Sequence, residues 1–142
     1  MHNPFGTEIT SDEISETLSF FDDWEQRYRY IIDLGKQLPE IEDSLKTESN
    51  LVRGCQSQVW IVISAQDDKL YFDVDSDAHI VRGLLALVVS AYNGRTPDEI
   101  LNFDVEAWFE QLQLLKHLSP IRGNGLRAMV NRICQEAQQH KA

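Results

Sequence analysis

Two neighbouring segments of different pattern constrain the fold of this chain most strongly. Residues 59–64 are apolar at nearly every position and rich in β-branched side chains, whereas residues 70–75 alternate apolar with polar side chains. The letters QDDK between them are typical of a turn. This pattern predicts an antiparallel hairpin. We expect its first strand to be covered on both faces and its second strand to bury the face that holds Leu70, Phe72 and Val74.

Helical patterns lie on both sides of this hairpin. Thr10 and Glu13 have capping-box spacing, and Ser76 or Asp77 is placed to cap the most apolar helix. We expect a chain break at 119–125, where Ser119, Pro120, Gly123 and the Asn124-Gly125 pair occur. The expected helices cover residues 11–21, 23–38, 77–93, 96–101, 105–118 and 126 onward, and a polar connector at 40–50 precedes a short strand around 51–53. The pattern predicts an α+β fold in which a small antiparallel sheet packs against several helices.

Length, charge and hydropathy narrow the classes of function. A chain of 142 residues with 42% hydrophobic residues is long enough for one domain, which we expect over 1–142 with residues 1–10 as a candidate flexible N-terminal arm. A net charge of -10 disfavours binding to nucleic acid or to an anionic membrane surface. The longest apolar run, residues 84–89, is far shorter than a membrane helix, and the first ten residues do not resemble a secretory signal. We therefore expect a cytoplasmic protein.

Cys55 is the most unusual candidate for chemistry. It stands between Gly54 and three polar residues, Gln56, Ser57 and Gln58, just outside the apolar strand. A glycine beside the thiol permits a positive φ and lets a large partner group approach the sulfur. A thiol at a loop tip suits a nucleophile, since the reactive form is the thiolate. Spacing alone leaves open a second interpretation, in which Gly54 makes a turn and Cys55 fills a small gap.

The other candidate side chains have simpler explanations. Cys134 lies on the apolar face of the last expected helix, where core packing accounts for it. His79 and His117 stand near opposite ends of expected helices, and neither has the spacing of a metal ligand set. We expect no metal site. A cysteine hydrolase, which would pair Cys55 with a histidine, is a weaker alternative.

At GCQSQVW, residues 54–60, the chain resembles the SufE/CsdE family, the sulfur acceptors of cysteine desulfurases. Four further blocks carry the resemblance: YIIDLGKQLP (30–39), DSDAHIVRGLLA (75–86), NFDVEAWF (102–109) and HLSPIRGNGLRAM (117–129). Together they span roughly residues 20–135. NPFGT and VRGLLA look more like the CsdE branch, whereas GCQSQVW and NFDVEAWF look more like the SufE branch.

The resemblance implies an α+β fold shared with iron–sulfur scaffold proteins of the IscU type. It also implies that Cys55 takes a sulfane sulfur from a SufS/CsdA-like cysteine desulfurase and passes it on for iron–sulfur cluster assembly. Pyridoxal phosphate belongs to that desulfurase, so the chain itself needs no cofactor. Such a protein is an accessory sulfurtransferase without independent turnover. A downstream acceptor, such as an iron–sulfur scaffold, is a second expected partner.

We place part of the docking face at residues 54–58 and at the start of the helix 77–93. Asp75, Asp77 and Arg122 match family blocks and are assigned to loop support or partner docking. The Cys55 loop is expected to have two states, because an exposed persulfide would be lost to stray thiols or oxidants. Two alternatives stay open: a CsdE-like carrier that feeds another acceptor pathway, and a regulatory module that binds the desulfurase without covalent chemistry.

Overall fold

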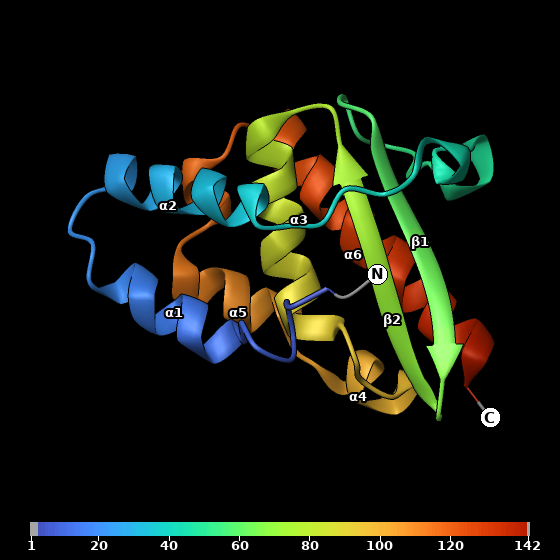
Figure 1. Cartoon of the computed structure of the whole chain (residues 1–142). Coiled ribbons are helices and arrows are strands. Elements are labelled where there is room, and N and C mark those ends of the chain that lie inside the picture. Colours follow the sequence, from blue (N-terminus) through green and yellow to red (C-terminus); the bar gives the residue numbers. More distant parts are fainter. Residues whose placement is uncertain (1–2, 142) are drawn as a thin grey trace.

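The computed structural model describes residues 3–141 and places one antiparallel hairpin against a set of helices (Figure 1). The two strands are β1 (Val59–Gln66) and β2 (Lys69–Ser76). The helices are α1 (Ser11–Ser19), α2 (Trp24–Lys36), α3 (His79–Tyr92), α4 (Pro97–Asn102), α5 (Val105–Leu112) and α6 (Pro120–His140), with short 3-10 turns at Asp43–Leu45, Glu48–Asn50 and Leu115–His117. The expected α+β class is confirmed.

The antiparallel hairpin forms where the sequence predicts it. β1 and β2 pair antiparallel from Val59 with Ser76 to Gln66 with Lys69. Their turn contains Asp67 and Asp68, both at positive φ (54° and 66°), the left-handed pair that a tight hairpin turn requires. Burial of β2 on the face of Leu70, Phe72 and Val74 is confirmed.

The expectation that β1 is covered on both faces is wrong. The sheet has two strands in the described chain, and the outward side chains Trp60 and Val62 are only half-buried. The connector before the hairpin covers part of Trp60, because Lys46 places its ammonium 5.4 Å from the centre of the Trp60 ring. The predicted short strand is reduced to a bridge between Leu51 and Trp60.

α3 is the central helix, and it crosses α2 at very short distance (Figure 1). All but two of its residues are buried. Gly35 of α2 faces Gly83 of α3, and a Cβ on Gly83 would lie 2.3 Å from the carbonyl oxygen of Ile31. The two backbones therefore touch, which no side chain at either position would allow.

Side-chain caps fix several helix starts where the sequence predicts them. Thr10 caps α1 by accepting from the N–H of Glu13, Asp23 caps α2, and Thr96 forms a reciprocal capping box with Glu99 at α4. The prediction that Ser76 or Asp77 caps the apolar helix is wrong. α3 begins at His79 after Ala78, without a side-chain cap. Both polar side chains bind the backbone of Gln58, and the Ser76 hydroxyl also accepts from the N–H of Ala78 (3.3 Å), just before the helix.

The last third of the chain also departs from the predicted helix limits. The helix expected over 105–118 ends at Leu112, because Gln113 adopts a left-handed φ of 56°. The break expected at 119–125 does not occur. Ser119 caps α6, Pro120 occupies its first position, and the helix continues through Gly123 and Gly125. Those two glycines are buried within the helix, Gly123 beside Leu115 and Gly125 beside Cys55, and neither forms a turn.

We expected a candidate flexible arm at residues 1–10, and the structure packs its described part, residues 3–10, on the domain. Phe5 is fully buried. The Asn93 side chain donates to the Phe5 carbonyl (2.9 Å) and accepts from the N–H of Phe72 (2.8 Å), and Asn3 donates to the Phe72 carbonyl (3.0 Å). These bonds tie the segment to the outer edge of β2. Residues 1 and 2 lie outside the described residues.

No helix within residues 3–141 combines the length and the apolar character that a membrane crossing requires. The buried side chains of β2, α2, α3 and α6 form one continuous cluster.

Candidate functional site

The Cys55 loop is a short excursion between two fixed ends. At its base, the N–H of Val52 donates to the carbonyl of Val59 (2.8 Å). Gly54 has a φ of 92°, so the loop reverses at a conformation that favours glycine. Cys55 follows at the tip and lies outside β1, as the sequence predicts.

The Cys55 thiol points inward against α6. Its Sγ donates to the carbonyl of Gly125 at 3.5 Å, and the side chain is half-buried. A Cβ at Gly125 would lie 3.7 Å from this sulfur, an ordinary contact distance, so the thiol packs directly on the backbone of α6. Burial raises the pKa of the Cys55 thiol above its ordinary value, because the thiolate would lose its hydration. In this state the thiol is sheltered and protonated.

A small hollow of about 50 Å³ adjoins the sulfur. It is lined by Cys55, Gln56, Ser57, Val81, Leu84, Ser119, Ile121, Arg122, Gly125 and Met129. The lining of this described hollow includes one cation and no carboxylate, although the whole chain carries 23 acidic residues. The acidic side chains therefore lie away from this hollow, and an anionic sulfur group in it would meet no negative side chain in the lining.

Two of the predicted support residues, Gln58 and Asp77, hold the C-terminal end of the loop together with Ser76. The N–H of Gln58 donates to Oδ1 of Asp77 (3.1 Å), and the Gln58 carbonyl accepts from Oγ of Ser76 (2.7 Å). Asp77 is therefore in direct contact with the loop. The exposed side chains of Gln56 and Gln58 leave this part of the loop open to a partner.

Asp75 lies in a different environment from Asp77. Its side chain is 5% exposed and pairs with Arg82, and Lys46 lies 3.6 Å from its second oxygen. A carboxylate so enclosed is not available for partner docking. Its position suits a structural role beside the loop.

Arg122 connects the hollow to α2. Its side chain lines the hollow, and Nη1 donates to the hydroxyl of Tyr28 (3.2 Å). Arg53, the nearest charge to Cys55 in sequence, instead pairs with Glu48 on the exposed side of the loop (3.0 Å). Arg122 is thus the cation that the fold brings to the cysteine.

The remaining nucleophile and base candidates lie elsewhere. His117 stacks on Trp24, with ring centres 4.4 Å apart, and His79 lines a separate polar hollow with Arg82. Neither borders the described Cys55 hollow, so no Cys–His pair supports a hydrolase. Cys134 is half-buried against the core on α6, in agreement with a packing role. Among residues 3–141, no three His, Cys, Asp or Glu side chains gather as potential metal ligands.

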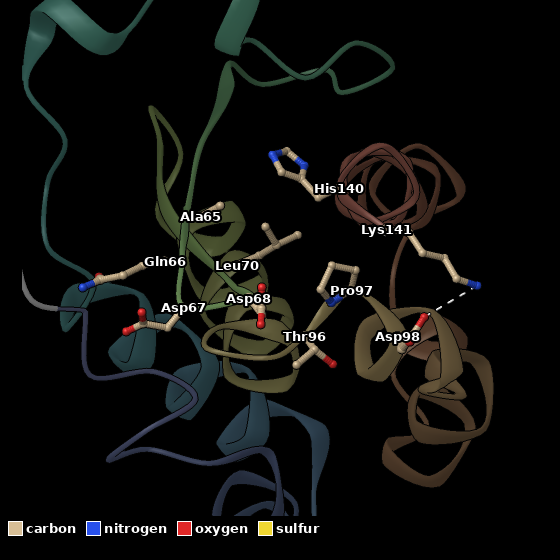
Figure 2. Close-up of a pocket in the computed structure, with 10 residues that line it drawn as sticks. All are labelled: Ala65, Gln66, Asp67, Asp68, Leu70, Thr96, Pro97, Asp98, His140 and Lys141. Carbon is tan, nitrogen blue, oxygen red and sulfur yellow. Dashed lines mark ion pairs between the residues drawn. The ribbon is translucent and has the colours of Figure 1, made fainter.

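A much larger hollow of about 490 Å³ lies at the other end of the hairpin (Figure 2). Asp67 and Asp68 of the hairpin turn border it, and Lys141 pairs with Asp98 across one side (3.6 Å). Its lining contains no cysteine, and its ionic groups are exposed or paired. Of these two hollows, the smaller one therefore adjoins the candidate cysteine.

Sequence reasoning missed the apolar part of the site. Ile121, in the first turn of α6, borders the Cys55 hollow with 57% of its surface exposed. Apolar surface rimmed by polar side chains is typical of interaction sites. The only local signal was an isoleucine between a proline and an arginine, and the predicted chain break at 119–125 hid its place in a helix.

Comparison with known proteins assigns the fold and the family. A solution structure titled as a hypothetical protein from Thermus thermophilus is similar with a TM-score of 0.75 over 99% of this chain and 98% of that chain, at 17% identity, which supports the fold alone. Uncharacterized SufE-like proteins from Rhizobium meliloti and Rhizobium etli are 47% identical over 131 residues, covering 89% of this chain and 94% and 88% of theirs. The family model described as "SufE: Fe-S metabolism associated domain" matches residues 12–137. The chain therefore belongs to the SufE family.

Proposed function

We propose that this chain accepts sulfur on Cys55 from the persulfide of a cysteine desulfurase and delivers it for iron–sulfur cluster assembly. The observation that carries the proposal is the position of Cys55, at the tip of a loop with its thiol turned into a small hollow, in a member of a family associated with iron–sulfur metabolism. A buried packing cysteine would not require the adjacent left-handed glycine, Gly54, or the exposed loop around it.

The transfer is a thiol exchange without net oxidation. The Cys55 thiolate attacks the outer sulfur of the desulfurase persulfide, and a new S–S bond forms as the old one breaks. The desulfurase cysteine leaves as a thiolate, and Cys55 becomes a persulfide. Delivery repeats the exchange, with an acceptor thiolate as attacker and Cys55 as the leaving group. Pyridoxal phosphate chemistry stays with the desulfurase.

A sulfur carrier must protect its sulfur between partners and present it to a partner, and the two proposed states of the loop meet these two requirements. We assign the inward arrangement of Cys55 to a closed state that protects the sulfur, and the hollow of about 50 Å³ beside it exceeds the ~10–15 Å³ that a single water needs. Opening turns Cys55 outward, where hydration lowers the pKa of its thiol and supplies the thiolate. The loop thus favours protection between partners and reactivity at a partner.

The docking face in this proposal consists of the loop residues 54–58 and the exposed side chain of Ile121. An exposed apolar side chain beside polar, uncharged side chains suits a specific protein interface. Arg122 is placed to attract the anionic persulfide as the loop moves, and Asp77 steadies the loop through Gln58.

The test is mass spectrometry of peptides after the protein has been incubated with cysteine and a desulfurase from the same cell, without reductant. We expect one added sulfur atom on the Cys55 peptide, absent without desulfurase and removed by reductant. Cys134→Ser is the matched control and should load as wild type does, whereas Cys55→Ser should gain no sulfur on Cys134.

Stimulation of desulfurase turnover separates covalent relay from regulation by binding. Cys55→Ser should bind the desulfurase but fail to raise its turnover. Full stimulation by this variant would refute the relay and favour a regulatory binding module. Identification of the acceptor that removes the persulfide sulfur then distinguishes delivery to an iron–sulfur scaffold from the CsdE-like alternative.

A further inference from the structure

Arg82 occupies the closest crossing of α2 and α3, one residue before Gly83. From there its Nε donates to the carbonyl of Gly35 (3.2 Å) and its Nη2 to the carbonyl of Leu38 (2.8 Å). Carbonyls at the end of a helix have no partner within that helix. Arg82 gives the Gly35 carbonyl a partner besides the N–H of Leu38 (3.3 Å), and the backbone contact at Gly83 holds the guanidinium within reach.

The remaining guanidinium nitrogen of Arg82, Nη1, reaches the end of β2. Nη1 donates to Oδ1 of Asp75, and the same oxygen accepts from the N–H of Ser76 (2.8 Å). Removing Arg82 would leave the enclosed Asp75 carboxylate with Lys46, at 3.6 Å, as its ionic partner and would take away the contact that joins it to α3. The ion pair thereby fixes the backbone where the chain leaves the sheet.

That backbone is the part of the chain that holds the Cys55 loop. Ser76 and Asp77 bind both polar groups of the Gln58 backbone, and the N–H of Asp77 also reaches the Gln58 carbonyl (3.4 Å). A continuous series of contacts thus runs from the end of α2 through Arg82 and Asp75 to the base of the loop.

We propose that Arg82 is a positioning residue that couples the end of α2 to the Cys55 loop and limits how often the loop opens. The inference deepens the proposed function, since loop opening is the step that exposes the thiol to a partner. Lysine at position 82 keeps a charge beside Asp75 but lacks the planar fork that reaches three acceptors at once.

The experiment measures how fast iodoacetamide alkylates Cys55 in the folded protein, at 25 °C and without any desulfurase. When opening and closing are fast, this rate follows the open population, as proteolysis does. Arg82→Lys should raise the rate about fivefold, the change expected from weakening one or two contacts. Ser76→Ala removes the hydroxyl that binds Gln58 without touching the ion pair, and should raise the rate as well.

Two controls separate coupling from a general loss of stability. Cys134 is an internal reference thiol, and its alkylation rate should not change. Ile100→Val, in α4 at the far end of the hairpin, removes a core methylene and lowers stability without touching the loop (Figure 1). Its Cys55 rate should stay at the wild-type value.

The proposal is overturned if Arg82→Lys lowers the melting temperature but leaves Cys55 alkylation within about twofold of wild type. It is equally overturned if Ile100→Val raises the Cys55 rate as much as Arg82→Lys does. Because no desulfurase is present, the result does not depend on sulfur transfer. Faster alkylation in Arg82→Lys together with no persulfide on wild type would keep the coupling and refute the proposed function.

Discussion

Replacing Gly83 by alanine tests the contact on which the position of Arg82 depends. A Cβ at this position would lie 2.3 Å from the carbonyl oxygen of Ile31, whereas ordinary contacts of this kind begin at 3.4 Å. The oxygen belongs to the backbone and cannot rotate away. The two helices would therefore have to move apart by about 1 Å along their contact.

The expected cost follows from two opposing effects. Overpacking of a close contact costs about 1–3 kcal/mol. Alanine in a helix is favoured over glycine by about 1 kcal/mol, which offsets part of this cost. Because separation of α2 from α3 also lengthens the bonds from Arg82 to Gly35 and Leu38, we place the net loss near 2 kcal/mol, or about 4–8 °C in melting temperature.

The assay is thermal unfolding followed by circular dichroism, with Gly123→Ala as the matched control. Gly123 is also a buried helical glycine, but its added Cβ would meet Leu115 Cδ2 at 3.6 Å, an ordinary contact. This variant should melt up to about 3 °C above wild type through helix preference alone. A Gly83→Ala protein that melts at or above the wild-type temperature would refute the backbone contact.

Three further predictions concern the site and the N-terminal segment. Burial raises the pKa of the Cys55 thiol in the closed loop, so closure is most favourable at a pH below the pKa of the exposed thiol. Closure weakens as the pH rises through the raised pKa of the buried thiol. Alkylation of Cys55 should therefore titrate at higher pH in the folded protein than in urea. Ile121→Asp should weaken desulfurase binding at least about tenfold in titration calorimetry while the melting temperature stays unchanged, and unaltered affinity would remove Ile121 from the docking face. Asn93→Ala leaves two buried backbone groups, of Phe5 and Phe72, without their partner and should cost about 2–4 kcal/mol in urea unfolding; a loss below about 1 kcal/mol would show that the segment is held by other contacts.

The sequence by itself determined the hairpin, most helix starts and the choice of Cys55. The alternation of Leu70, Phe72 and Val74 is a property of the strand itself, and the caps at Thr10 and Thr96 act within three residues. Such signals depend on local geometry, so they can be read without knowing what packs nearby. The oddity of a cysteine beside a glycine, just outside an apolar strand, was equally visible.

Only the tertiary structure decided what surrounds that cysteine. Gly125 looked like part of a turn, yet it lies inside α6, where its carbonyl accepts from the thiol of Cys55, a residue 70 positions earlier in the chain. Asp75 and Asp77 looked equivalent, but the crossing of α2 and α3 delivers Arg82 to the first and leaves the second for the loop. Burial and pairing between distant residues carry no local pattern, and they are set by how the helices pack around the hairpin.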